Sequence, residues 1–437
     1  MTDGLFKFGD ERDWFTRARF GLFVHWGIYS VAGWHEQHAY LRRMTRKAYA
    51  PLMRRFNPAR FNPDEWLDMA EAAGMRYICF TAKHIDGFCM WDTALTEFKV
   101  TRTPFGRDVL AMLAEACRRR GFPLCLYYSV ADGSHPNYPH AGRAYEYPAP
   151  QPGDLPDAEK YMAFLKAQVR ELCSGYGKIH GFWWDANVMN ARDPSINAMI
   201  RQLQRGIVIN NRGMDEGDFG TPERDWDEYV NSEPAFARPI EACQSIGYQS
   251  WGWRRNEDYY SDAHLSGSIQ KILAKGGNFL LNAGPRADGS FPAAAKRRLS
   301  RIGAWYGVVK EALLDAAPAS GLLSERGPLL TRRGSDLYVH LCQQPITDAV
   351  YLHPIADLPR RAVVLNTGRP ARFDIADLPR LHAMTPNRCL RIYRLPVNQR
   401  SLAGWVIKLE FDHPPEILFA AAGATARVQS DNCKDDK

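Results

Sequence analysis

The sequence predicts a TIM-like (β/α)8 barrel followed by a C-terminal antiparallel β-sandwich. Between residues 19 and about 285, short runs rich in β-branched and aromatic residues alternate with amphipathic stretches, as in a parallel sheet covered by helices. After about residue 316, short alternating or apolar runs follow one another at turn-like spacing, which is typical of a sandwich. The length of 437 residues suits a barrel of roughly 250 residues with a second domain.

The barrel elements are expected in a regular order. Asn62 and Pro63 suit the start of a helix, and Gly74 and Gly121 suit the ends of two helices. Five β-then-α steps are clear in the sequence, and six or seven of the eight expected βα units can be identified directly. The expected strands are 19–27, 75–84, 122–130, 178–186, 207–212, 241–248 and 278–284, and the expected helices are 62–74, 106–121, 157–177, 194–206, 262–276 and 293–316.

Three segments follow from this pattern. We expect the catalytic barrel over residues 1–318, the β-sandwich over 319–425 and a frayed polar tail over 426–437. The sandwich runs include "DLYVHLC", "RAVVLNT" and "GWVIKLEFD". We expect this second domain to brace the barrel rather than to bind carbohydrate.

Composition excludes several classes of protein. The net charge of +7 is spread thinly, and its one dense cluster, "RRMTRKAYAPLMRR", is interpreted as a solvated arginine-rich face, so we expect no nucleic-acid partner. No signal peptide and no run of about 18 apolar residues is present, which predicts a cytoplasmic protein without a membrane partner. The nine cysteines lack CxxC spacing and are expected to be mostly buried free thiols. The sequence leaves open whether the protein forms a homo-oligomer.

Reactive residue types gather where successive expected strands end. In a (β/α)8 barrel, that end carries the active site because the βα loops open there. Each residue taken singly could be structural, but their shared position indicates one functional pocket. These residues are His25 and Trp26, Lys83 and His84, Tyr127 or Tyr128, Trp183 and Asp185, and Asn211 and Arg212.

The chemistry of this set favours a glycosidase. Aromatic faces stack on sugar rings, and His, Arg and Tyr side chains hydrogen-bond hydroxyl groups. Glycoside hydrolysis needs a second carboxyl beside Asp185, and the candidates are Glu223, Glu233 and Glu241. A metal site formed by His25, His84 and Asp185 is the competing interpretation. No HxH or HExxH pattern supports it and Lys83 would repel a cation, so no metal is predicted.

Six ordered motifs lie within residues 10 to 320. They are "RFGLFVHWGIYSVAGW", "TAKHIDGFCMWDT", "GFWWDAN", "GDFGTPER", "EACQSIGYQSWGW" and "GGNFLLNAGPRADGSFP". Together they resemble the motifs of the α-L-fucosidases of glycoside hydrolase family 29. The resemblance implies a TIM-like barrel with a β-sandwich and a retaining mechanism that needs no cofactor. The substrate would be a fucosylated oligosaccharide or glycoside.

The same resemblance implies roles for individual residues. Asp185 would be the nucleophile that forms a covalent glycosyl-enzyme. Glu241 is the first choice for the acid/base residue, and Glu223 is the second. The implied substrate-binding residues are His25, His84, Tyr128, Trp183, Arg212 and Trp251, with Glu36, His38 or neither in place of a family glutamate.

Three departures from the family pattern affect sugar recognition rather than the nucleophile. Ile85 replaces a hydroxyl-binding histidine, "HEQHAY" replaces a loop that often reads S-E-W-Y, and Gly133 stands where a tryptophan is common. Two functions therefore stay open. The first is a retaining exo-glycosidase acting on α-L-fucosides or a stereochemically related sugar, and the second is a catalytically weak or inactive sugar-binding relative.

Overall fold

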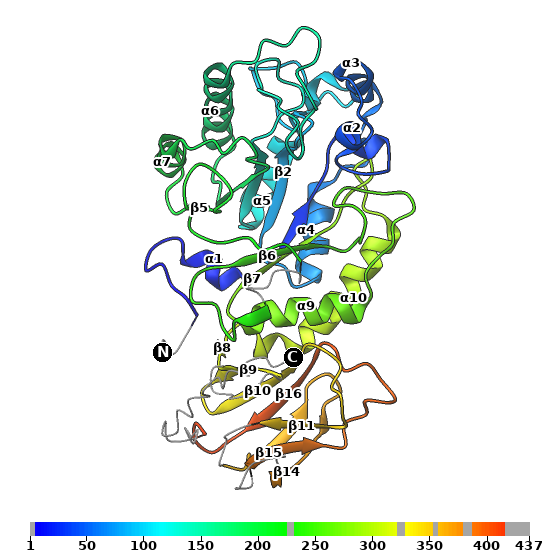
Figure 1. Cartoon of the computed structure of the whole chain (residues 1–437). Helices are drawn as coiled ribbons and strands as arrows, with labels where there is room; N and C mark the ends of the chain where they lie inside the picture. The colour runs from blue at the N-terminus through cyan, green and yellow to red at the C-terminus, as the bar shows by residue number, and fades with distance from the viewer. Residues whose placement is uncertain (1–4, 225–230, 321–327, 353–356, 379–386, 416–437) are drawn as a thin grey trace, which may run out of the picture.

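The computed structural model describes residues 5–224, 231–320, 328–352, 357–378 and 387–415. A curled, helix-covered sheet forms one part of the molecule, and antiparallel strands from the C-terminal third form the other (Figure 1). The predicted fold class, a TIM-like barrel with a C-terminal β domain, is confirmed. The expected tail over 426–437 lies outside the described residues, and the exact domain boundaries stay a prediction.

Seven parallel strands form the barrel sheet in the order β5-β4-β3-β2-β1-β7-β6. Single bridges join Asn210 to Phe219, Gly220 to Ile240 and Glu223 to Cys243. The segment 219–223 therefore takes the eighth position in the ring, between β5 and β6. The strands are β1 Phe20–Val24, β2 Ile78–Lys83, β3 Leu124–Ser129, β4 Gly181–Asp185, β5 Val208–Ile209, β6 Glu241–Ser245 and β7 Asn278–Asn282.

Two predicted helix boundaries are confirmed, whereas the helix expected over 293–316 ends at Val309. The Asn62 side chain accepts hydrogen bonds from the first-turn amides of α4, and Gly121 ends α5 at φ 62°, a left-handed conformation that costs glycine little. The helices of this part are α1 Asp13–Ala18, α2 His38–Leu41, α3 Arg46–Tyr49, α4 Pro63–Ala72, α5 Val109–Arg120, α6 Ala158–Gly175, α7 Pro194–Leu203, α9 Asp262–Ala274 and α10 Ala293–Val309.

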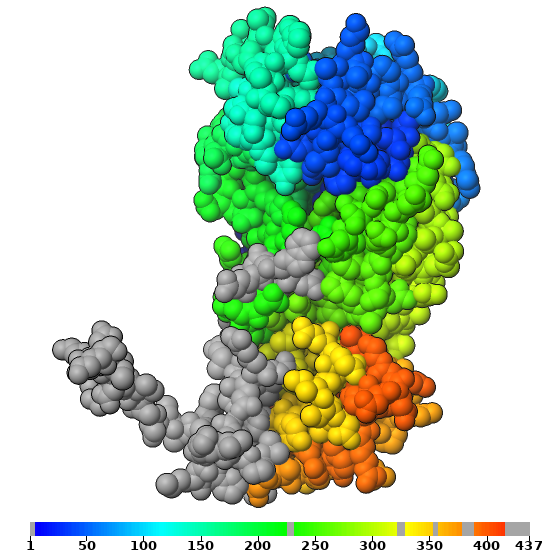
Figure 2. All heavy atoms as spheres, turned by 45° about the vertical axis from the view of Figure 1, so that its right-hand side comes forward, coloured from blue at the N-terminus to red at the C-terminus, as the bar shows by residue number. Residues whose placement is uncertain are grey.

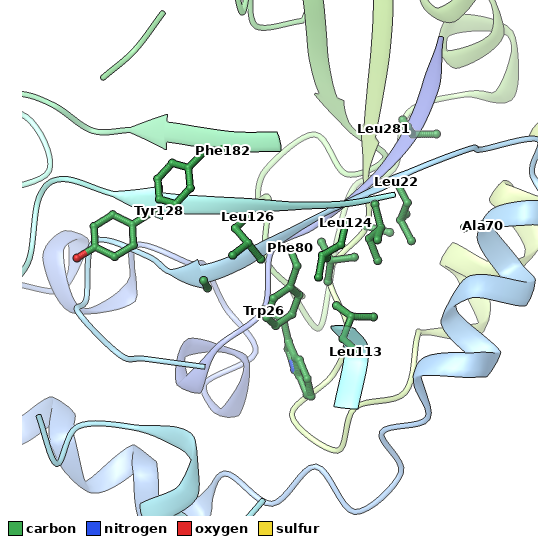
Figure 3. Close-up of a cluster of buried hydrophobic side chains, with 14 of the residues drawn as sticks. Leu22, Trp26, Ala70, Phe80, Leu113, Leu124, Leu126, Tyr128, Phe182 and Leu281 are labelled. Atoms are coloured by element: carbon green, nitrogen blue, oxygen red, sulfur yellow. The ribbon is translucent and has the colours of Figure 1, made fainter. Parts of the chain in front are cut away.

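Alternation along the strands builds two apolar layers. Even-numbered side chains of β1 to β4 face outward, where they pack with Ala70 of α4 and Leu113 of α5 (Figure 3). Phe23, Tyr127 and Trp183, at odd-numbered positions, point into the barrel and belong to a separate cluster. Gly21 makes this interior possible, because a Cβ there would lie only 2.5 Å from the Tyr77 ring that crosses it.

Two antiparallel sheets form the C-terminal domain, which appears as a separate lobe below the barrel (Figure 2). Their apolar faces enclose one core that includes Leu337, Val339 and Ile407. The domain is joined to the barrel helices by bonds such as that from Gln270 Nε2 to the Trp405 carbonyl, 2.8 Å. The strands are β8 Ala317–Pro318, β9 Leu329–Arg333, β10 Asp336–Leu341, β11 Ala349–Leu352, β12 Arg361–Val364, β13 Arg369–Pro370, β14 Arg372–Leu378, β15 Asn387–Tyr393 and β16 Trp405–Glu410.

The cysteines of the described ranges are mostly buried free thiols, as the sequence predicts. All eight cysteines in the described ranges are free thiols, and seven of them are buried. Among the described residues, no helix is both long and apolar enough to cross a membrane.

Candidate active site

A cavity of about 120 Å³ opens at the carboxyl ends of the barrel strands. This volume is below the roughly 300–1,000 Å³ typical of sites for drug-sized ligands and suits a single sugar unit. Eight of the predicted site residues line the cavity, whereas Tyr128 and Glu241 do not. The eight are His25, Glu36, His84, Trp183, Asp185, Arg212, Glu223 and Trp251, and they are joined by Phe23, Gln37, Ile85, Tyr127, Tyr145, Ala186 and Cys243.

Arg212 connects two carboxylates at the centre of the cavity. Its Nη1 donates to Asp185 Oδ1 at 2.9 Å and to Glu223 Oε1 at 2.6 Å. Because both bonds share one nitrogen, Asp185 Oδ1 and Glu223 Oε1 lie at most about 5.5 Å apart, which is compatible with the roughly 5 to 5.5 Å between the carboxyl groups of retaining glycosidases. Thr221 orients the guanidinium by accepting from Nε and Nη2, each at 2.7 Å.

The surroundings of Asp185 keep its carboxyl ionised. Burial by itself raises its pKa, but the positive charge of Arg212 and the hydrogen bonds from Arg212 and Tyr127 outweigh burial, and the pKa is lowered overall. Tyr127 donates to Asp185 Oδ2 at 2.7 Å. Burial and the negative charge of Asp185 raise the pKa of the Tyr127 phenol well above its usual value, so Tyr127 stays a proton donor in this bond.

The backbone of β6 holds Glu223 beside the cavity. The Arg224 amide donates to the Cys243 carbonyl at 2.8 Å, and the Cys243 amide donates to the Pro222 carbonyl at 3.1 Å. This pairing fixes the segment that closes the barrel ring. The Glu223 side chain is 46% exposed, so it reaches both Arg212 and solvent.

Aromatic rings form one wall of the cavity. Trp183 stacks on Tyr127 with ring centroids 5.6 Å apart, and Tyr127 stacks on His84 at the same distance. The Arg212 guanidinium lies 4.8 Å from the centre of the Trp183 ring. Flat aromatic surfaces beside hydrogen-bonding groups suit the apolar and hydroxyl-bearing faces of a sugar.

The two cavity histidines are neutral at physiological pH. Burial lowers the pKa of His25, and it lowers that of His84 to about 3, with a further contribution from His25. His25 Nδ1 lies 2.8 Å from Asn282 Oδ1, which holds the ring in place. No group of three or more His, Cys, Asp or Glu side chains in the described part of the chain is arranged to hold a metal ion.

Glu36 reaches the cavity from the loop after β1. Its Oε2 accepts from the Ser250 hydroxyl and from the amides of Trp251 and Gly252, at 2.7 to 3.0 Å. These bonds tie the loop after β1 to the loop after β6. Of the two loop residues that the sequence offers, Glu36 lines the cavity, whereas His38 does not.

The family assignment rests on comparison with known proteins. The family model described as Alpha-L-fucosidase matches residues 8–311, well over half of the chain. The chain belongs to the alpha-L-fucosidase family. The resemblance drawn from the six motifs is thereby confirmed, and the chain is a glycoside hydrolase by family.

Individual relatives of this alpha-L-fucosidase family member cover most of its length. The tissue alpha-L-fucosidase of Bos taurus is 25% identical over 395 residues, which are 83% of this chain and 81% of the relative. The structure of alpha-L-fucosidase isoenzyme 1 from Paenibacillus thiaminolyticus is 28% identical, with a TM-score of 0.78 and coverage of 93% and 100%. A Bacteroides thetaiotaomicron alpha-L-fucosidase, trapped as a covalent intermediate with 2-fluoro-fucosyl fluoride, is 23% identical, with a TM-score of 0.74 and coverage of 94% and 98%.

Tyr128 does not face the cavity, which corrects the expectation for this residue. It is 0% exposed, and it lies in the outer layer with Phe182 (Figure 3), where its hydroxyl donates to Gln168 at 2.7 Å. Tyr127 takes the expected position instead. The register of β3 and β4 pairs Tyr127 with Trp183, so these two side chains share the inner face.

Glu241, the first choice for the acid/base residue, also lies outside the cavity. It is 2% exposed, at the start of β6, and therefore far along the strand from the catalytic end. Its Oε1 accepts from Trp183 Nε1 at 2.9 Å, and its Oε2 accepts from the Tyr77 hydroxyl at 2.5 Å. The expectation of a cavity-facing Glu241 is corrected, because its carboxyl is enclosed in the barrel core below Trp183.

Glu241 makes the stability of the protein depend on pH. Burial raises its pKa from an ordinary 4.5 to about 7, although the bonds from Tyr77 and Trp183 oppose this. The folded state therefore keeps a proton that the unfolded chain loses, and the free energy of unfolding falls as the pH rises from about 4.5 to about 7. We expect Glu241→Gln to lack this loss and to exceed the wild type by up to about 3 kcal/mol at pH 8.

Urea unfolding of both proteins at pH 5 and pH 8 checks this prediction. Other carboxyl groups titrate in the same range, so the quantity to compare is the difference between variant and wild type at each pH. A difference that is the same at both pH values would mean that Glu241 is ionised throughout.

Proposed function

We propose that the chain is a retaining exo-α-L-fucosidase with Asp185 as the nucleophile and Glu223 as the acid/base residue. The observation that carries this proposal is the Arg212 bridge, which holds the two carboxylates in one cavity within about 5.5 Å. The family supports an α-L-fucoside as substrate. The covalent intermediate trapped in the Bacteroides relative supports double displacement.

In the first step, ionised Asp185 attacks the anomeric carbon, and the bond to the leaving oxygen breaks. Glu223 gives its proton to that oxygen, so the aglycone leaves as a neutral alcohol. The two carboxylates share the guanidinium of Arg212, which holds Glu223 beside Asp185 in the cavity where the bond breaks.

In the second step, water hydrolyses the glycosyl ester. Esterification removes the negative charge of Asp185 and leaves Arg212 paired with Glu223 alone. Glu223 takes a proton from the water, whose oxygen attacks the anomeric carbon, and the Asp185 carboxylate is released. Two displacements on opposite faces give a product with the configuration of the substrate.

The remaining lining residues are proposed to bind the glycone. The neutral imidazole of His84 offers one donor and one acceptor for a ring hydroxyl. His25 donates from Nδ1 to Asn282 Oδ1, so it offers the lone pair of Nε2. Trp183 and Trp251 supply apolar faces, and Glu36 supplies an acceptor that the loops have already oriented. A closed pocket of one-sugar size suits removal of a terminal residue rather than cleavage within a chain.

Hydrolysis of aryl glycosides tests the proposal. We expect turnover of an aryl α-L-fucoside, slower turnover of the matching galacto and arabino compounds, and α-L-fucose as the first product in proton NMR. First formation of the β anomer would contradict the retaining mechanism. Absence of turnover on every glycoside would favour the sugar-binding alternative. The cytoplasmic location and the absence of a nucleic-acid partner stay predictions, and a homo-oligomeric state stays open.

A further inference from the structure

A small side chamber adjoins the catalytic cavity. It shares four lining residues with the cavity and holds about 10 Å³, roughly the volume that one water molecule needs. The shared residues are Glu36, Gln37, Ile85 and Tyr145, and the chamber adds Ala39, Tyr40, Asp86, Gly133, His140, Glu146 and Tyr147.

Unused polar atoms surround this chamber. His140 is only 6% exposed, and neither of its ring nitrogens has a hydrogen-bond partner among the described residues. Glu36 Oε1 also lacks one there. His35 Nδ1 lies 3.4 Å from this oxygen but accepts a hydrogen bond from the Gln37 amide, so it does not donate to Glu36. A buried polar group without a hydrogen-bond partner destabilises the folded protein unless a ligand or a water molecule supplies that bond.

The chamber has rigid walls. Arg46 Nε donates to the Gly133 carbonyl at 2.6 Å, and the same guanidinium pairs with Asp154 at the other end of the loop between β3 and α6. Tyr147 lies against Gly133, where a Cβ would be 3.3 Å from its ring. A side chain at residue 133 would therefore crowd Tyr147 at this place in the wall.

The chemistry of the walls selects a hydroxyl group. Burial lowers the pKa of His140, so the imidazole is neutral and offers one N–H donor and one lone pair. The carboxyl groups of Glu36 and Asp86 disfavour an anion, whereas Glu146 is paired with Arg143. An apolar group would leave His140 and Glu36 unsatisfied. A hydroxyl donates and accepts at once and has the size of the space.

We propose that this chamber is a subsite for one hydroxyl group of the sugar ring, recognised by His140 together with Glu36. The inference rests on the proposed function, because the sugar must occupy the adjoining cavity. Ile85 cannot hydrogen-bond a hydroxyl, and the chamber supplies this recognition from a different loop. The chamber therefore determines which sugar the cavity accepts.

Monodeoxy substrates test the subsite. Aryl α-L-fucosides that lack the hydroxyl at C2, C3 or C4 are compared with the parent compound, for the wild type and for His140→Ala. We expect His140→Ala to lower kcat/KM about tenfold or more on the parent and on two deoxy compounds, but to have little effect on the third. The intrinsic reactivity of each deoxy sugar cancels in the ratio of variant to wild type.

Two further variants separate recognition from folding. His140→Gln keeps a donor and an acceptor, so it should recover part of the lost kcat/KM on the parent compound. His180→Ala removes another partly buried imidazole just before β4, at the opposite end of that strand from Asp185, and should leave the pattern across the deoxy series unchanged.

The subsite would be overturned if His140→Ala and His140→Gln each lowered kcat/KM by the same factor on all four substrates, or if neither variant changed it on any of them. Such a result would mean that the chamber holds only a structural water. A wild type that turns over none of the substrates would instead overturn the proposed function.

Discussion

Asp185→Ala is expected to lower the turnover of an aryl α-L-fucoside by about a thousandfold or more, because no other group in the cavity is placed to form the covalent intermediate. The side chain lies at the mouth of the barrel and is 26% exposed, so its removal should leave the fold intact. Stopped assays give the loss of kcat, and circular dichroism checks the fold. Asp193→Ala is the matched control, because it removes a nearby carboxylate that only caps α7.

External nucleophiles sharpen this first prediction. In Asp185→Ala, azide can enter the space that the carboxylate occupied and displace the leaving group once, so the product should be the β-fucosyl azide. Near-normal turnover by Asp185→Ala would mean that Asp185 is not the nucleophile. An azide product of α configuration would place the nucleophile elsewhere.

Substitution of Glu223 is expected to lower kcat far more than substitution of Glu241. Glu223→Gln is expected to lower kcat by about a hundredfold or more on substrates with a poor leaving group, because these need protonation. The loss should be smaller on an activated aryl fucoside. Glu241→Gln should stay within a few-fold of the wild type, because it keeps one acceptor for Trp183 and one donor toward Tyr77 inside the core.

A larger loss of kcat in Glu241→Gln than in Glu223→Gln would make Glu241 the acid/base residue. A further check uses azide with Glu223→Gln, which should accelerate breakdown of the glycosyl-enzyme and give an azide with the configuration of the substrate. Glu241→Gln should give no such product, since its step from ester to sugar is not impaired.

Position within a strand explains which site residues could be predicted from the sequence. Asp185 ends a strand, and His25, His84 and Arg212 lie shortly after strand ends; all four line the cavity. The same reasoning identifies Tyr127, because alternation places it on the inner face with Trp183 and leaves Tyr128 outside.

The same rule applies to Glu241. It is the first residue of β6, whereas the active site of a barrel lies where strands end, so its place in the run "EACQSIGY" argues against a cavity position. The motif resemblance favoured it, but the geometry of the strand decides where its carboxyl lies.

Other features depend on contacts between distant loops and could not be predicted. Glu36 is placed by bonds to residues 250–252, and Glu223 is placed by pairing of its segment with β6. Arg46, which the composition assigns to a solvated basic face, instead ties the chamber loop to Asp154. No local pattern encodes such pairings, because each depends on where two loops meet in the folded barrel.

Trapping of the glycosyl-enzyme tests the central claim most directly. Glu223→Gln is incubated with 2-fluoro-fucosyl fluoride, whose good leaving group permits the first step while the variant slows the second. Intact mass spectrometry should show one added 2-fluorofucosyl group, and peptide mapping should place it on Asp185. A label on another residue, or no label from a protein that still hydrolyses fucosides, would contradict the account.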